Sequence, residues 1–388
     1  MPTSARATCY LPWAIPTTGA TATNGSARMR NAGDDYRRRW LERRQRGAEA
    51  ATGDGCVTAP DATGAVRALY ECYPYPSREQ AAPIRDVSNA IEMLLGPGAL
   101  HGRCVLDAGC GTGHRLVGMA RQFPHTRFTG LDLSTASLDV AASLVARHGL
   151  SNVTLLQGDL SHGNIAGRYD LIVSTGVIHH LPSPRSGFQS LAGALSDDGL
   201  LYAWLYHAYG EFERMLEREL VAVFHGDGDD LQQGIAVVDA LGCVLPDDQY
   251  GATGARLDDA EEWRRSKLAD AYLHPVVHTM RIEQALDLLE GTGLDWAGVN
   301  GCNCMGHSHL FDLHRLADGL ERELSIYPEA AFEHADIRRR ARALDPLKQL
   351  RALELKLKPT GFSIVAGKNA ALRHCTRRIG GNVLRRWN

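Results

Sequence analysis

Three glycines at alternate positions, Gly109, Gly111 and Gly113, follow a strand-like stretch that contains Asp107. Glycine lets the backbone turn sharply and approach a ligand closely, because no Cβ atom stands in the way. The residues after Gly113 are typical of a helix, and a helix N-terminus presents unpaired N–H groups to polar or anionic ligand atoms. The loop therefore predicts a ligand site between a strand and a helix, although dinucleotide sites use a similar loop.

Three further stretches carry polar residues where a strand would end. The motif LDLS contains Asp132, about twenty residues after the glycines, where a doubly wound sheet places the carboxylate that holds ribose hydroxyls. The motif QGDL contains Asp159, and YDLIVSTGVIHHLP contains His179 and His180. These stretches are typical of the second, third and fourth strands of an alternating strand and helix pattern, which indicates a parallel sheet with helices on both faces.

The motifs DAGCGTGH, LDLS, QGDL and YDLIVSTGVIHHLP, in this order and spacing, resemble those of the class I S-adenosylmethionine-dependent methyltransferases. The resemblance is to the small-molecule branch, in which the fourth strand commonly runs into a His-His-Leu-Pro ending, and its core covers roughly residues 100 to 206. It implies an α/β fold with a Rossmann-like, doubly wound, seven-stranded and mostly parallel sheet with helical insertions, whose last strand lies antiparallel beside the sixth. It also implies S-adenosyl-L-methionine as cofactor and methyl transfer to an oxygen, nitrogen or carbon atom of a small organic acceptor.

The same resemblance implies roles for residues of these motifs. Asp107 would orient the amino acid end of the cofactor, and Gly109, Gly111 and Gly113 would allow its close approach. Asp132 would accept hydrogen bonds from the ribose hydroxyls, with a helix N-cap as the alternative role. The remaining expected cofactor contacts are Leu133 and Leu160 beside the adenine, Asp159 at its amino group, and Thr175 with Gly176 along the far wall.

His179 and His180 are the candidates for acid–base catalysis, because the pKa of an imidazole ordinarily lies near working pH. A hydroxyl acceptor needs a base nearby, whereas a thiol or an activated carbon acid needs less help. The alternative is structural: one ring shapes the floor of the pocket and the other is held in a hydrogen bond. The sequence leaves both interpretations open.

Several successive parts are expected around this core. They are a disordered leader at 1–60, with a transit peptide as the alternative; an N-terminal helical and Tyr-Pro cap at 61–99; the methyltransferase core at 100–301, with an insertion at about 207–280; a helical insertion at 302–359; the last core strand at 360–368; and a basic tail at 369–388. The insertions are expected to build the acceptor pocket, because the cofactor takes the strand ends.

Further features of these parts concern the pocket. In similar methyltransferases a Tyr-Pro segment caps the pocket; the alternative is that Tyr73 and Tyr75 pack on the outside of the sheet. His274 and His278 precede an expected return helix, where substrate-facing residues can lie. Apolar side chains at helical spacing predict a packing face on the helix after the fifth strand; they are Phe212, Met215, Leu216, Leu220 and Val223.

Metal-ligand residue types gather at Cys302, Cys304, His307 and His309. Their spacing is not that of a standard zinc module, because no second Cys-x-x-Cys or His-x₃-His arm follows. The segment comes after the expected sixth strand, so shaping the substrate pocket is the other interpretation. We therefore predict no metal, and the role of the cluster stays open.

The composition of the chain limits the kinds of partner that can be expected. The chain has 388 residues, of which 44% are hydrophobic and 22% charged, as in ordinary globular proteins. A net charge of −3 gives no indication of a nucleic-acid partner, and no apolar run approaches the ~20 residues that span a bilayer. Nine scattered cysteines and no secretory signal favour the reducing cytoplasm. The acceptor, the methylated atom and the oligomeric state do not follow from the sequence.

Two other functions share part of the pattern. An NAD(P)-dependent Rossmann oxidoreductase has the same sheet and ribose acid, but its Gly-x-Gly-x-x-Gly fingerprint requires glycine where His114 stands. A non-catalytic regulatory module that binds S-adenosylmethionine would keep the cofactor fold without turnover. Methylation of a base amino group is not indicated, because the fourth strand does not end in Asn-Pro-Pro-Tyr.

Overall fold

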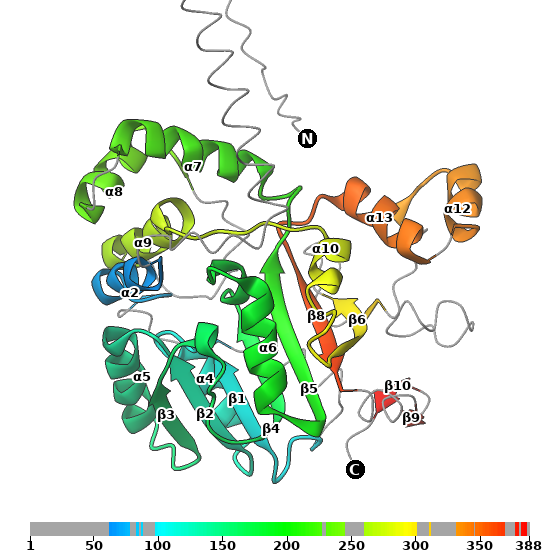
Figure 1. Ribbon diagram of the computed structural model, residues 1–388, viewed down its shortest axis with the longest axis horizontal. Helices are drawn as coiled ribbons and strands as arrows, with labels where there is room; N and C mark the ends of the chain where they lie inside the picture. Colours follow the sequence, from blue (N-terminus) through cyan, green and yellow to red (C-terminus); the bar gives the residue numbers. More distant parts are fainter. Residues whose placement is uncertain are drawn as a thin grey trace, which may run out of the picture. The chain divides into compact units, whose positions relative to one another are not determined.

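The computed structural model describes residues 62–77, 83–84, 87, 98–226, 230–244, 260–300, 310–311, 331–344, 346–368, 377–379 and 382–385. Its centre is an eight-stranded sheet in the order β3-β2-β1-β4-β5-β8-β6-β7 (Figure 1). The strands are β1 (Cys104–Ala108), β2 (Arg127–Asp132), β3 (Val153–Gln157), β4 (Tyr169–Thr175), β5 (Leu195–Tyr206), β6 (Asp295–Asn300), β7 (Leu310–Phe311) and β8 (Gly361–Gly367).

The first five strands are parallel, and β8 lies between β5 and β6, antiparallel to both. This arrangement confirms the predicted doubly wound α/β fold with its antiparallel last strand. The eighth strand of the sheet is β7, a two-residue extension of its edge that the sequence did not predict.

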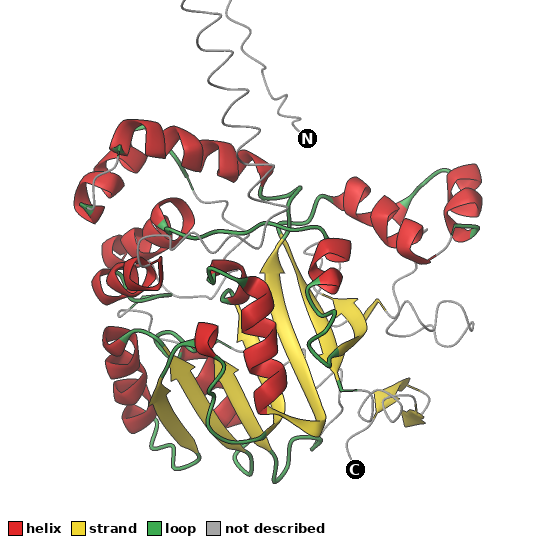
Figure 2. Ribbon diagram, viewed as in Figure 1, coloured by secondary structure: helices red, strands yellow, loops and turns green. Residues whose placement is uncertain are grey.

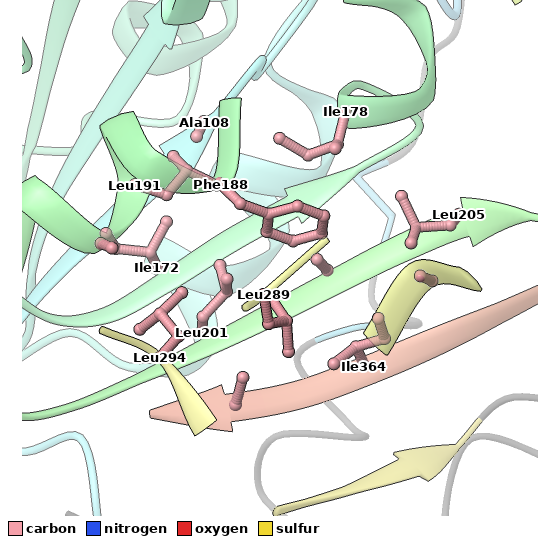
Figure 3. Close-up of a cluster of buried hydrophobic side chains, with 14 of the residues drawn as sticks. Ala108, Ile172, Ile178, Phe188, Leu191, Leu201, Leu205, Leu289, Leu294 and Ile364 are labelled. Atoms are coloured by element: carbon pink, nitrogen blue, oxygen red, sulfur yellow. The ribbon is translucent and has the colours of Figure 1, made fainter. Parts of the chain in front are cut away.

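Alternate residues along β1 and β5 enter two different hydrophobic cores, as the two-residue period of a β-strand requires. Leu106 and Leu201 belong to the core that contains Phe188, whereas their neighbours Val105 and Leu200 belong to the core on the other face. Figure 3 shows the first of these cores, with the Phe188 ring among aliphatic side chains. The helices that cover the sheet are α4 (His114–Gln122), α5 (Thr135–Arg147), α6 (Pro184–Ala194) and α10 (Ile282–Asp287).

Helices beyond the carboxyl ends of the parallel strands form a third hydrophobic cluster (Figures 1 and 2). They are α2 (Ala62–Cys72), α7 (Phe212–His225), α8 (Leu231–Ala240), α9 (Ala260–Leu268) and the single turn η4 (Ala269–Leu273) that continues α9. Leu69 of α2 packs there with Val238 and Tyr272, so the N-terminal helix joins the inserted helices. Residues from both sides of the core sequence thus cover the same edge of the sheet.

The predicted packing face of α7 is wrong for the residues that the structure describes. Phe212 is 60% exposed and Val223 75% exposed, and Leu216 and Leu220 are also exposed. The buried residues of α7 include Val221 and the charged Arg214 instead, because Arg214 finds an ion-pair partner in the interior. Helical spacing therefore identified the helix but assigned the wrong side of it to the interior.

The second insertion includes α12 (Ala335–Arg342) and α13 (Pro346–Leu357), and α13 is tied to the sheet by a buried carboxylate. Glu354 Oε1 accepts hydrogen bonds from His207 Nε2 at 2.8 Å and from the Ile282 N–H at 2.7 Å. His207 follows β5 and Ile282 begins α10, so one side chain joins three elements. Leu350 and Leu353 of α13 enter the same core as Phe188.

The remaining expectations lie partly or wholly outside the described residues. The leader at 1–60 and the cluster of Cys302, Cys304, His307 and His309 belong to the undescribed ranges. Within the expected basic tail, β9 (Arg377–Ile379) and β10 (Asn382–Arg385) form a two-stranded antiparallel ladder. Over the ranges given above, no helix combines the length and the apolar character needed to cross a bilayer.

Candidate functional site

The glycine loop turns tightly over the carboxyl end of β1. Gly109, Gly111 and Gly113 have φ values of 80°, 52° and 77°, a region that other residues rarely adopt. A Cβ atom on Gly109 would overlap Val177, which follows β4, and one on Gly111 would overlap the carbonyl oxygen of Tyr75. The predicted loop is therefore glycine-rich for a physical reason: two other segments pass within contact distance of its backbone.

Asp132 lies at the end of β2 and holds this loop in place. Its Oδ2 accepts a hydrogen bond from the Gly111 N–H at 2.7 Å, and its Oδ1 accepts one from the Ser134 N–H at 2.9 Å. Burial raises the pKa of the carboxyl above its usual range, and these N–H groups act in the opposite direction. The N-cap of α5 is Ser134, which accepts from the Ser137 N–H, so the N-cap role considered for Asp132 belongs to its neighbour.

The other expected cofactor residues lie along the same edge. Asp107 is buried at the end of β1, and Thr175 ends the adjacent strand β4. The Thr175 hydroxyl is buried and bonds to none of the described residues. Asp159, after β3, caps the 3₁₀ turn η1 (Leu160–His162) through the Ser161 N–H at 2.7 Å. The adenine contacts expected of Leu133, Asp159 and Leu160 stay predictions.

The segment after α2 lies directly on the glycine loop. The carbonyl oxygen of Tyr75 accepts a hydrogen bond from the Thr112 N–H at 2.9 Å. The Glu71 carboxylate accepts from the N–H groups of Thr135 and Ala136, at 2.6 and 3.1 Å, at the start of α5. These bonds join the N-terminal segment to both sides of the predicted cofactor site. Tyr73 packs against the third hydrophobic cluster, not against the sheet.

Next to this site, the structure gathers three histidines. His179 and His180 form the turn η2 (Ile178–His180) that follows β4, and both rings are buried. The His180 ring stacks on the ring of His274 with centroids 3.8 Å apart, and the His179 ring lies 3.9 Å from that of Tyr206. His274 follows η4 and joins this group because the insertion folds back over the sheet. We call the rings of His179, His180, His274 and Tyr206 the histidine cluster.

The histidines of this cluster are uncharged at neutral pH. Burial lowers the pKa of His180 from 6.5 to about 4, and it lowers the pKa values of His179 and His274 well below the ordinary imidazole range. The expectation of a pKa near working pH was therefore wrong. The residue types were correctly identified, but the sequence did not reveal that both rings are enclosed.

Charged side chains that no motif indicated surround the cluster. Arg214 of α7 forms a buried ion pair with Glu211, and its guanidinium lies 4.5 Å from the centre of the Tyr206 ring. Asp270 of η4 accepts a 2.7 Å hydrogen bond from the Tyr70 hydroxyl. Lys267, three residues before Asp270, is also buried. Burial lowers the pKa of its amine to about 7. The contact between Tyr70 and Asp270 joins residues 200 positions apart, and sequence spacing gives no signal for it.

In the described part of the chain, no three His, Cys, Asp or Glu side chains are placed to hold a metal ion.

Comparison with known proteins agrees with the fold. Residues 106–201 match the family model described as a methyltransferase domain. Over 263 residues the chain is 31% identical to an uncharacterized protein of Synechococcus sp., which covers 62% of this chain and 61% of that protein. A malonyl-[acyl-carrier protein] O-methyltransferase of Halalkalibacterium halodurans is 34% identical over 112 residues, 28% of this chain and 40% of its own length.

Among solved structures, PKMT2 from Rickettsia typhi has a TM-score of 0.51 at 16% identity, over 77% of this chain and 54% of that one. This likeness supports the fold alone. The chain spans less than two thirds of the length of each of these relatives. Residues 106–201 thus match a methyltransferase domain, and the sheet order and the glycine loop with its acidic partner agree with that match.

Proposed function

We propose that the chain transfers a methyl group from S-adenosyl-L-methionine to a small organic acceptor, at the carboxyl ends of β4 and β5. The observation that carries this proposal is the division of the sheet edge into two halves. The ends of β1 and β2 present the glycine loop and Asp132, whereas the ends of β4 and β5 present the buried histidine cluster. A transferase for two ligands needs two such adjacent sites.

The residues at the first half fit the cofactor. The Asp132 carboxylate accepts backbone hydrogen bonds from Gly111 and Ser134, and its two oxygens have about four lone pairs in all, so capacity remains for a ribose hydroxyl. A Cβ atom built on Gly176 would meet no described atom within 4 Å, so there is open space beside the end of β4. The unpartnered hydroxyl of Thr175 lies next to it in sequence. These features support a role for Asp107, Gly109, Gly111, Gly113, Asp132 and Thr175 in holding the cofactor.

When bound, the cofactor supplies an activated methyl group, so the protein has to orient the acceptor and exclude water. The histidine cluster supplies a site shielded from solvent for this purpose, because its imidazole rings are buried. We assign proton transfer to His180, whose Nε2 bonds to none of the described residues. His179, packed against Tyr206 with neither ring nitrogen partnered in the described structure, is assigned to the wall of the site.

The test is calorimetric titration with S-adenosylhomocysteine and, separately, with NADH. We expect the wild-type chain to bind S-adenosylhomocysteine and not NADH. Asp132→Ala should abolish binding, because it removes the acceptor for the loop and for the ribose. Asp139→Ala, on the exposed side of α5, is the matched control and should bind like the wild type. Binding of NADH in place of S-adenosylhomocysteine would refute the proposal and favour an oxidoreductase.

A further inference from the structure

We infer that the methylated atom is a hydroxyl oxygen, which His180 and His274 hold together, one as hydrogen-bond acceptor and the other as donor. This inference rests on the proposed function and names the acceptor class of that site. It follows from Val276, whose carbonyl contacts one ring and whose N–H contacts the other. These two contacts place the proton on Nδ1 in His180 and on Nε2 in His274.

The two bonds to Val276 determine which nitrogen of each ring carries the proton. The carbonyl oxygen of Val276 lies 2.8 Å from His180 Nδ1, and a carbonyl can only accept, so His180 is protonated at Nδ1. The N–H of Val276 lies 3.1 Å from His274 Nδ1 and can only donate, so His274 is not protonated at Nδ1. Since both rings are uncharged, His180 has a bare Nε2 and His274 has an Nε2–H.

Neither of these two Nε2 atoms has a hydrogen-bond partner in the part of the chain that the structure describes. His274 is 1% exposed, and its Nε2 is buried and has no hydrogen-bond partner among the described residues. His180 Nε2 likewise bonds to none of them. A buried N–H without a partner costs free energy, and a catalytic role or an unseen bound group is among the explanations for one in a native protein. The stacked rings thus offer one acceptor and one donor from neighbouring positions.

A hydroxyl group satisfies both rings and can still react. Its proton is donated to His180 Nε2, one lone pair accepts from His274 Nε2–H, and the second lone pair remains free to attack. The nitrogen of an amine has one lone pair, so a bond from His274 would occupy the electrons that must attack. A carbon nucleophile has no lone pair to accept that bond. The arrangement therefore selects oxygen.

The transfer is balanced in atoms and charge. The hydroxyl oxygen forms a bond to the methyl carbon while the bond from that carbon to the sulfonium sulfur breaks and leaves its electron pair on sulfur. The hydroxyl proton passes to His180 Nε2, which gives an imidazolium, a methyl ether and S-adenosylhomocysteine. His274 keeps its proton throughout, so it positions the oxygen and does not exchange protons with it.

The first test measures the protonation directly. Nitrogen-15 NMR spectra of the imidazole rings, recorded on the full chain near neutral pH, distinguish protonated from bare ring nitrogens. His180→Asn and His274→Asn provide the assignments. We expect His180 to carry its proton on Nδ1 and His274 on Nε2. The opposite protonation of either ring would overturn the inference.

The second test compares phenol with aniline, two rings that differ only in the reacting atom, because the site is lined by aromatic side chains. We expect the wild type to methylate phenol with a kcat/KM about tenfold or more above that for aniline, as one added hydrogen bond provides. His274→Asn keeps an acceptor for the Val276 N–H but loses the Nε2–H, so the ratio should fall to about one. His274→Gln, whose amide N–H stands near the Nε2 position, should preserve a preference for phenol.

S-adenosylhomocysteine binding distinguishes failure of the proposed methyltransferase function from failure of the hydroxyl assignment. Loss of that binding in the wild type would reject the methyltransferase function itself. Binding with a preference for aniline, or a ratio unchanged in His274→Asn, would reject the hydroxyl assignment alone. If His274 had a purely structural role, His274→Asn and His274→Gln would both lose stability, but the ratio of kcat/KM for phenol to that for aniline would not change. This outcome differs from the one that the hydroxyl assignment predicts.

Discussion

Acidification should destabilise the protein through the buried imidazole of His180. The pKa of His180 falls from 6.5 to about 4 on folding, mainly because burial disfavours the imidazolium. Between these values the unfolded chain binds a proton that the folded chain does not, so stability is fully present above about pH 6.5 and decreases as the pH falls. Each pKa unit corresponds to about 1.4 kcal/mol, which gives about 3 kcal/mol in total and about 2 kcal/mol by pH 5.

The groups that face His180 modify the pKa that burial sets. Asp270 and the carbonyl of Val276 favour the charged form, whereas Arg218 and Arg214 disfavour it. None of these interactions outweighs burial. His179 and His274 titrate in the same direction for the same reason, so the total loss of stability in the wild type should exceed the contribution of His180.

Urea unfolding near pH 7.5 and near pH 5, for the wild type and His180→Asn, isolates this contribution. Asparagine retains an N–H for the Val276 carbonyl but does not titrate. We expect the wild type to lose about 2 kcal/mol more than the variant over this interval. Equal losses in both chains would mean that the His180 ring is not held uncharged in the folded state, and would refute the assignment of a bare Nε2.

Three further substitutions test separate parts of the structure. Gly111→Ala should abolish S-adenosylhomocysteine binding in calorimetry and lower the free energy of unfolding by about 1–3 kcal/mol. The reason is that φ is 52° at Gly111 and the Tyr75 carbonyl oxygen blocks the Cβ position. The control Gly193→Ala, in open space on α6, should be neutral or slightly stabilising. Glu354→Ala should cost about 2–4 kcal/mol in urea unfolding, because it leaves two buried N–H donors unpaired; a cost below about 1 kcal/mol would show that the contact is not formed. Phe188→Ala should cost about 3–5 kcal/mol and the exposed Phe212→Ala less than about 0.5 kcal/mol; a reversed order would restore the packing face first expected on α7.

The sheet was predictable from the sequence because its information is local. The segments of strands β1 to β4 combine aliphatic residues with glycines and acids at short sequence distances, and each feature is encoded within a few residues. The start of β5 was less accurate: pairing begins at Leu195, opposite Tyr169, five residues before the apolar run at Leu200. Residues 196–198 are polar or acidic, and the pairing with β4 shifts register between Leu195 and Leu200, which no local pattern indicates.

The acceptor side was only partly predictable, because its chemistry is assembled over long sequence distances. His179 and His180 were identified from their motif, but their protonation depends on Val276, which lies 96 residues beyond His180. Arg214 occupies the buried side of α7 where periodicity alone would place an apolar residue. A charged residue can be buried there because Glu211 and the Tyr206 ring are present, and neither contact is visible as a pattern in the sequence.

Helix α2 has a consequence for how two ligands would communicate. Its Glu71 carboxylate and the following Tyr75 carbonyl bind the cofactor half of the site, while the hydroxyl of its Tyr70 binds Asp270, beside the histidine cluster. Any shift of this helix on occupation of one half changes the free energy of occupying the other, and thermodynamic linkage requires the effect to be reciprocal. Helix α2, which lies outside the core sequence of the domain, can therefore couple the binding of the cofactor to the binding of the acceptor.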